Sequence, residues 1–115
     1  MTYSREYLAT LESRRWRVLR RLCFAISWGQ DCVLPILPAQ ECDHLTYRRL
    51  GQELPLIDVV PLSRWTHRRV VTPLRARFGR SVVNPPLRFA FGCWLAIDVA
   101  LALLLVWFVV RHCPW

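Results

Sequence analysis

Apolar residues are spread unevenly along the chain, and their longest run lies near its C-terminal end. Residues 89–110 carry a single charged side chain, that of Asp98. As a helix this run would be about 33 Å long, close to the ~30 Å hydrocarbon core of a bilayer. A helix of a small soluble domain has no need to be apolar on every face. The pattern therefore predicts a transmembrane helix over residues 89–110, followed by a short tail over 111–115.

A second pattern, of alternating apolar and basic positions, fills the N-terminal segment 1–29. It predicts one helix from Ser4, which can serve as the N-cap, to Trp28, with Glu6 in the first turn and Gly29 as the end signal. An apolar arc of about 120° is expected on this helix, formed by Tyr7, Leu8, Leu11, Val18, Leu19, Leu22 and Ile26. A basic amphipathic helix can pack on its own domain, bind a partner's groove, lie in a membrane interface or target a protein to the mitochondrial matrix.

Frequent prolines from Asp31 to Pro86 exclude a long helix there, and they set the character of the segment 30–63. One short helix fits over Cys42–Leu54, and the stretch from Leu54 suits an extended segment. With few apolar residues here, a large independent core is not expected. The predicted fold class is mainly α, with a single C-terminal transmembrane helix, an amphipathic N-terminal helix and a proline-broken irregular middle.

Arginine dominates the charge of the chain, which carries a formal net charge of +8 and no lysine. Its densest part is the juxtamembrane segment 64–88, which holds no acidic residue and seven arginines: Arg64, Arg68, Arg69, Arg75, Arg77, Arg80 and Arg88. Each basic residue close to an anionic leaflet contributes about 1 kcal/mol. We therefore expect this segment to contact anionic lipid headgroups or an acidic partner surface. Binding of RNA through arginine and aromatic side chains is the weaker alternative.

These arginines also predict an orientation. Basic residues collect on the cytoplasmic side of a membrane or on its equivalent, the mitochondrial matrix, so the N-terminal body is expected there. Residues 2–21 are charged throughout and contain no apolar signal-peptide core, which is the layout of a tail-anchored protein. Mitochondrial and endoplasmic reticulum membranes are the expected settings, and a small viral membrane protein fits the same layout.

Three features of the apolar run indicate contacts with other membrane-protein subunits or with a second copy of the chain. Asp98 lies near the expected midplane, where a lone carboxylate costs roughly 2.5–3.5 kcal/mol. We expect it to meet a polar or basic group on a neighbouring span. Gly92, Ala96 and Ala100 form a row of small residues that permits close helix approach, on a face turned away from Asp98. Cys93, one turn inside the run, is a candidate for lipidation.

One short motif points to a different function. The stretch YRRLGQEL, Tyr47 to Leu54, resembles the core of the BH3 helix of apoptosis regulators. The resemblance implies an amphipathic helix that binds a hydrophobic groove. Tyr47, Leu50 and Leu54 would face that groove, and Gly51 would be the close-approach position. Gln52 stands where the family carries aspartate, and Pro55 would stop the helix.

No residues stand at the spacings that catalysis or metal binding requires. The three histidines are scattered, and the sequence has no glycine-rich phosphate loop, no nucleophile elbow and no paired metal ligands. We therefore expect a non-enzymatic protein without a cofactor. The first hypothesis is an accessory or regulatory binding subunit of a membrane complex. The second is a tail-anchored regulator of apoptosis or signalling that acts through residues 47–54.

Overall fold

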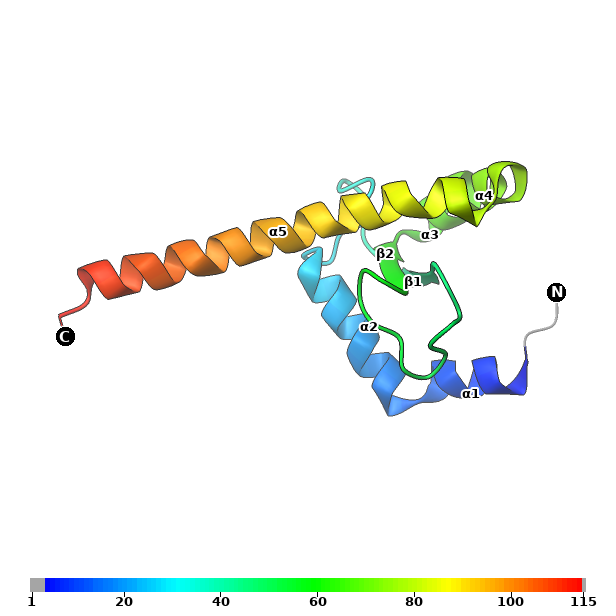
Figure 1. Cartoon of the computed structure of the whole chain (residues 1–115), viewed down its shortest axis with the longest axis horizontal. Helices are drawn as coiled ribbons and strands as arrows, with labels where there is room; N and C mark the ends of the chain where they lie inside the picture. Colours follow the sequence, from blue (N-terminus) through cyan, green and yellow to red (C-terminus); the bar gives the residue numbers. More distant parts are fainter. Residues whose placement is uncertain (1–3, 115) are drawn as a thin grey trace.

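The computed structural model describes residues 4–114 and is mainly helical, with one long helix that projects from a small body (Figure 1). The body contains α1 (Arg5–Glu12), α2 (Arg14–Ile26), a two-stranded sheet and three short helical segments. The long helix is α5 (Arg80–His112). The predicted fold class, mainly α with one long apolar C-terminal helix, is confirmed.

The N-terminal segment is two helices rather than the single predicted one. Ser4 is the N-cap of α1, as expected, and accepts a hydrogen bond from the Tyr7 N–H. At Ser13 the backbone is extended, and the Ser13 hydroxyl accepts from the Trp16 N–H as the N-cap of α2. Serine competes well for such cap positions. The break rotates the buried side of α2 onto Trp16, Leu19 and Cys23, so the predicted single apolar arc is wrong.

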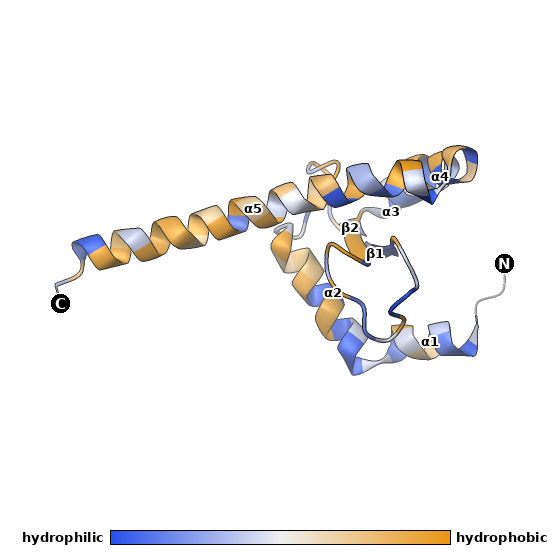
Figure 2. Cartoon of the chain, in the orientation of Figure 1, coloured by the Kyte–Doolittle hydropathy of each residue, from blue (hydrophilic) through white to orange (hydrophobic). Residues whose placement is uncertain are grey.

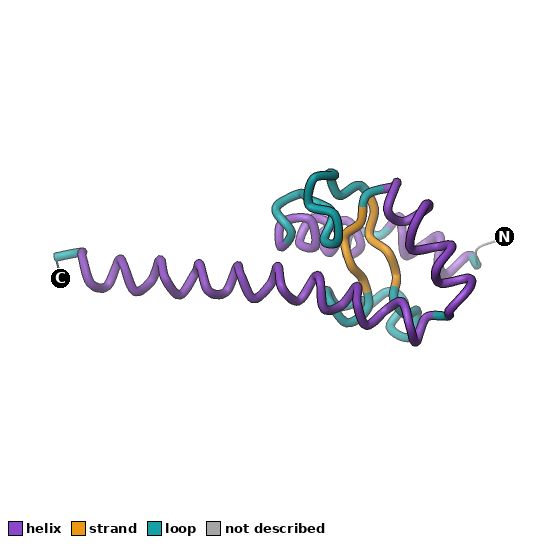
Figure 3. Tube along the Cα trace, turned by 90° about the horizontal axis from the view of Figure 1, so that it is seen from above, coloured by secondary structure: helices purple, strands orange, loops and turns teal. Residues whose placement is uncertain are grey.

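The middle of the chain forms a sheet where a helix was predicted. Strand β1 (Glu41–His44) pairs antiparallel with β2 (Val59–Leu62), with Glu41 opposite Leu62 and His44 opposite Val59. The predicted helix over Cys42–Leu54 is therefore wrong, and turns follow β1 instead. The extended segment expected after Leu54 is confirmed in β2. Figure 3 shows the two strands in the middle of the body, between helices.

The segment after β2 is helical in spite of its prolines. α3 (Arg64–Thr66) leads through a π-helical turn, His67–Val71, into α4 (Thr72–Phe78). The Thr72 N–H donates to the His67 carbonyl, five residues back. Pro73 has no N–H to donate and lies in the first turn of α4, where none is needed. Gly79, with φ of +85°, then reverses the chain into α5.

Helix α5 begins nine residues before the predicted span and belongs partly to the body. It contains Pro85 and Pro86, yet runs unbroken for 33 residues. Asn84, Leu87 and Phe91 on this helix are buried. Leu87 and Phe91 complete a hydrophobic core built from α2, the sheet and the π-helical turn, whose other members are Trp16, Leu19, Cys23, Cys32, Leu45, Val59, Val60, Leu62 and Val71. The body thus has a core of its own, which the sequence pattern did not predict.

Candidate membrane-facing site

Helix α5 divides into a covered half and a bare half. From Val99 to His112 every residue is exposed, and this half is hydrophobic up to its last turn (Figure 2). Among the described residues, α5 is the one helix long and apolar enough to cross a membrane, and none of its most apolar stretch is buried. The other half, from Arg80 to Asp98, lies against the body.

The covered half ends at Asp98, whose polar partner comes from the same chain. The Trp28 indole Nε1–H donates to Asp98 Oδ1 over 2.6 Å. Trp28 follows α2 and has a φ of +58°, a left-handed conformation that costs a non-glycine residue about 1–2 kcal/mol. Gly29, also left-handed, follows it. The expected polar contact of Asp98 is thus made within the chain, and a partner on a neighbouring span stays a prediction.

A second tryptophan makes a similar contact one helical turn earlier. The Trp94 Nε1–H donates to the Cys32 carbonyl over 3.1 Å. On the same half of α5, Gly92 lies beside Leu56, whose Cδ1 would be 3.6 Å from a Cβ added at Gly92. The first member of the predicted small-residue row therefore faces the chain's own body. Ala96 and Ala100 are exposed, and so is Cys93, the predicted lipidation position.

The seven arginines of residues 64–88 do not form a common surface beside the bare half of α5. Arg80 opens α5, about 14 Å along the helix before Phe89. The helices α3 and α4 lie at the same end of the molecule, away from the C-terminus (Figure 1). Several of these arginines bind the body: Arg64 pairs with Glu41, Arg75 with Asp43, Arg80 with the His44 and Leu45 carbonyls, and Arg88 with the Ile57 carbonyl.

The other three retain exposed guanidinium groups. Arg68 is 4.0 Å from Glu41, Arg69 is exposed, and Arg77 lies over the Phe78 ring. Lipid binding by the set of seven stays a prediction. Arg64 also keeps 57% of its side chain exposed, so its pairing with Glu41 does not remove it from the surface.

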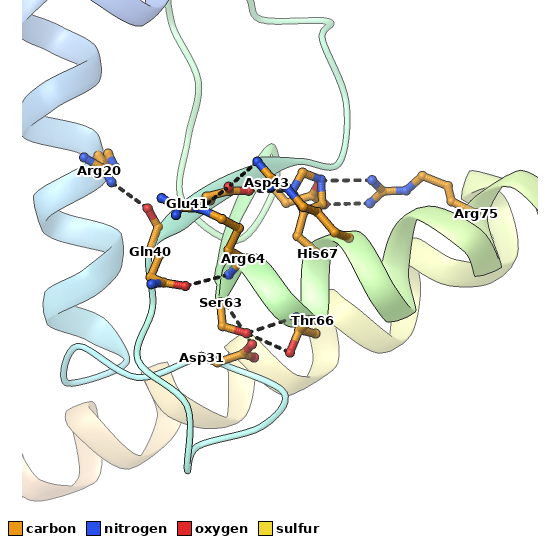
Figure 4. Close-up of polar contacts among 11 residues, drawn as sticks. Arg20, Asp31, Gln40, Glu41, Asp43, Ser63, Arg64, Thr66, His67 and Arg75 are labelled. Atoms are coloured by element: carbon orange, nitrogen blue, oxygen red, sulfur yellow. Dashed lines mark hydrogen bonds and ion pairs between the residues drawn. The ribbon is translucent and has the colours of Figure 1, made fainter.

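A partly buried ionic cluster, centred on the buried Asp43, fixes β1 to the helices that follow it (Figure 4). The Arg75 guanidinium donates to both Asp43 carboxylate oxygens, over 3.0 and 2.7 Å, and to Asn84 Oδ1 on α5. The His67 ring bridges Glu41, at 2.6 Å, and Asp43, at 3.1 Å. The cluster joins four elements, β1, the π-helical turn, α4 and α5, mainly through charged hydrogen bonds, the strongest kind.

Proton equilibria follow from this arrangement. The hydrogen bond to Asp43 raises the pKa of His67 against the effect of burial, and the bond to Glu41 raises it further. Burial acts to raise the pKa of Asp43, but hydrogen bonds from His67 and Arg75 outweigh it and lower that pKa. Glu41 behaves in the same way, with its pKa lowered by His67 and Arg64. The charged forms of all three groups are favoured.

The stretch with the BH3 resemblance is a turn, not a helix. Residues 47–54 include two turns and a left-handed Gly51, and Leu50 is partly buried. Tyr47 and Leu54 are exposed, but Tyr47 stacks on the buried His44 ring at 4.9 Å between centroids. His44 stacks on Trp16 on its other side, and burial lowers its pKa. The predicted groove-binding helix is therefore not preformed in this structure.

Comparison with known protein families, with curated proteins and with solved structures finds no match to this chain.

Sequence reasoning missed Trp28 and Trp94, which join the body to α5. The signal was present in the stretch WGQDCVLPILP, residues 28–38, which carries one charge among apolar residues and prolines. Residues 30–38 belong to the predicted irregular middle, because prolines hide any periodicity there.

Proposed function

We propose that this chain is a non-enzymatic, single-pass membrane protein that acts as an accessory or regulatory binding subunit of a membrane complex. The observation that carries the proposal is that the two ends of α5 differ in burial. One end of this helix is part of the body's core, through Leu87 and Phe91, and the other end is bare and apolar on all sides. A body fixed to a span in this way presents its surface at a constant orientation to the membrane and to neighbouring subunits.

The surface of the body supports an acidic partner or anionic lipid. Its carboxylates are mostly internal, since Asp31, Asp43, Glu53 and Asp58 are buried. Arginines therefore provide most of the exposed charge, in a chain with a net charge of +8. Such a field attracts acidic surfaces and raises association rates at low ionic strength.

The arginine excess before the span supports an orientation with the body on the cytoplasmic or matrix side. A mitochondrial or endoplasmic reticulum membrane fits this orientation. The outward-facing Ala96 and Ala100 support close packing against another span, from a different subunit or a second copy.

Membrane integration tests the first half of the proposal. The full chain should stay with the membrane pellet in alkaline carbonate. Leu103→Arg combined with Leu104→Arg should move it to the supernatant, because each central arginine costs roughly 2.5–3.5 kcal/mol. Ser81→Arg, also on α5 but on the body, is the matched control and should change nothing. A wild-type chain found in the supernatant would contradict the proposal.

Subunit binding tests the second half. The chain should co-purify in mild detergent with a fixed stoichiometry of another membrane protein or of itself. Ala96→Leu and Ala100→Leu should weaken that association, whereas Ala102→Leu, about 200° around the helix from Ala100, should not. A monomer with no bound protein at membrane-like concentrations would remove the subunit role.

A further inference from the structure

We propose that residues Trp28–Pro38, the loop that follows α2, form a wedge inserted into the lipid leaflet next to the body. Figure 1 places this loop and the C-terminal end of α2 at the end of the body that faces the bare half of α5. The inference rests on the proposed function in one respect, that α5 spans the membrane. It adds that the body is partly sunk into the bilayer instead of standing above it.

The depth of the loop follows from the length of α5. The bare half up to Val110 is only about 18 Å long, whereas the hydrocarbon core is about 30 Å thick. To fill that core, the span must extend back toward Phe91, past both contacts of the loop. The Cys32 carbonyl is held at Trp94, and Trp28 is held at Asp98. Even if the span reaches as far as Arg111 and His112, the Trp94 contact lies at the headgroup boundary and the Asp98 contact one turn deeper.

The outer side of the loop suits lipid. Trp28, Val33 and Ile36 are exposed, Ile36 at 89% of its surface, and Pro35 and Pro38 are exposed beside them. The single charge of the loop, Asp31, is fully buried. Contact with lipid stabilises this exposed apolar surface, whereas contact with water does not. Tryptophan is enriched at the headgroup level of membranes.

Many backbone polar groups of the loop are hydrogen-bonded within the protein. This matters in lipid, where each unpaired N–H or C=O costs several kcal/mol. Asp31 Oδ1 accepts from the Val33 and Leu34 N–H groups, and Asp31 Oδ2 accepts from Ser63. The Asp31 N–H donates to the Leu37 carbonyl, and the Cys32 N–H donates to the Pro61 carbonyl. The Leu37 N–H donates to the Leu34 carbonyl, and the Ala39 N–H donates to the Gly29 carbonyl. Pro35 and Pro38 have no N–H.

The side chain of Gln30 satisfies further groups of the same loop. In the amide orientation that satisfies both of its polar ends, it donates to the carbonyl oxygens of Leu37, at 3.1 Å, and Pro35, at 2.9 Å. An irregular segment with this many internal hydrogen bonds can enter the lipid interface without a sheet or helix of its own.

Helix α2 continues the same surface toward the headgroups. It runs from the loop away from α5 at a steep angle (Figure 1). Its exposed side carries Val18 and Leu22 together with Arg14, Arg17 and Arg21. Long arginine side chains beside apolar residues are typical of an interfacial helix, where the stem lies on the acyl boundary and the guanidinium reaches phosphate.

Collision accessibility of a nitroxide label tests the wedge in the full chain in nanodiscs that contain anionic lipid. The background replaces Cys42, Cys93 and Cys113 by alanine and keeps the buried Cys23 and Cys32. Labels are placed at Ile36→Cys in the wedge, at Leu103→Cys on the bare half of α5, and at Arg48→Cys on the exposed turn after β1. Oxygen, which concentrates in lipid, and a water-soluble nickel chelate are the two quenchers.

The expected result is that the label at position 36 resembles the one at 103, with a high oxygen-to-nickel ratio, while the label at 48 shows the reverse. A label at 36 that resembles the one at 48, with 103 still in lipid, would overturn the wedge and leave the proposed span intact. Protection of position 36 from both quenchers would mean that protein covers it, which also overturns the wedge. A nickel-accessible label at 103 would contradict the span itself and the wedge with it.

Discussion

At the scale of single residues, the contact between Trp28 and Asp98 explains how an apolar helix tolerates a carboxylate. If α5 spans a membrane, as proposed above, the indole N–H meets a carboxylate that would otherwise be unpaired in a medium of low dielectric constant. A hydrogen bond to a charged group contributes about 1.5–3 kcal/mol. This contribution is comparable to the insertion cost of an aspartate near the midplane, roughly 2.5–3.5 kcal/mol.

We predict that Trp28→Phe lowers the free energy of unfolding by about 1.5–3 kcal/mol in detergent. In an Asp98→Leu background the same change should cost about 1 kcal/mol less, because its hydrogen-bond partner is already gone. Thermal unfolding followed by near-ultraviolet circular dichroism measures both. Trp107→Phe, on the bare half of α5, is the control and should have little effect. Strictly additive changes would show that the contact contributes no stability.

Two histidines with opposite pKa shifts predict an optimum in stability near their ordinary pKa of 6.5. The pKa of His67 is raised, so its contribution is complete below pH 6.5 and is lost as the pH rises through the folded-state pKa. The pKa of His44 is lowered by burial, so its contribution is present above pH 6.5 and is lost as the pH falls.

Unfolding midpoints measured from pH 5 to 8 should therefore decline on both sides of pH 6.5. His67→Gln should flatten the alkaline side and leave the acid side unchanged. The carboxylates Glu41 and Asp43, whose pKa values are lowered, contribute only to losses at more acidic pH, below about 4.5. If the unfolding midpoint of His67→Gln still declines above pH 6.5, the decline belongs to another titrating group.

At the scale of elements, the sequence predicted what depends on local pattern and missed what depends on pairing. The apolar run predicted the bare half of α5, and Ser4 predicted the start of α1. Strand β1, with the sequence ECDH, shows no alternation of apolar and polar residues. Asp43 is buried against Arg75 and His67, which come from later helices, and His44 is buried by stacking on Trp16 and Tyr47. Frequent prolines predict that residues 31–86 have no long helix. In the structure, Pro73 lies in the first turn of α4, and Pro85 and Pro86 lie in the part of α5 that packs on the body.

The pairing of Arg75 with Asp43 should be the strongest single connection between β1 and the helices. Arg75→Met leaves the buried Asp43 carboxylate with His67 as its remaining charged partner, and loss of the two guanidinium hydrogen bonds costs about 1–3 kcal/mol. Arg75→Lys should recover part of this, because lysine keeps the charge but cannot bind both oxygens. Arg77→Met, two residues along α4 and exposed, is the matched control with an expected change below about 0.5 kcal/mol. Chemical denaturation measures the free energy of unfolding of the three variants. Equal losses of stability in Arg75→Met and Arg77→Met would contradict a special role of the Arg75–Asp43 pair.

At the scale of the whole molecule, the boundary between body and span does not lie where the apolar run begins. The pattern placed it at residue 89, because hydropathy does not distinguish a helix face buried in protein from one buried in lipid. In the structure, Phe91 is buried in the core at 1% exposure, whereas its neighbour Phe89 is 75% exposed. Residues 89–98 of α5 therefore belong to the apolar run by composition, while Phe91 among them belongs to the core of the body.

Phe89 and Phe91, two residues apart on α5, allow this boundary to be measured. Phe91→Ala should destabilise the body by about 3–5 kcal/mol, the cost of a large cavity in a packed core. Phe89→Ala removes the same atoms from an exposed position and should change stability by less than about 1 kcal/mol. Truncation gives an independent comparison: a fragment that ends at Val99 keeps Phe91, Trp94 and Asp98 and should unfold cooperatively in mild detergent. A fragment that ends at Arg88 lacks all three and should not. Cooperative unfolding of the shorter fragment, or equal effects of the two alanine substitutions, would return the boundary to residue 89 and separate the body from the membrane.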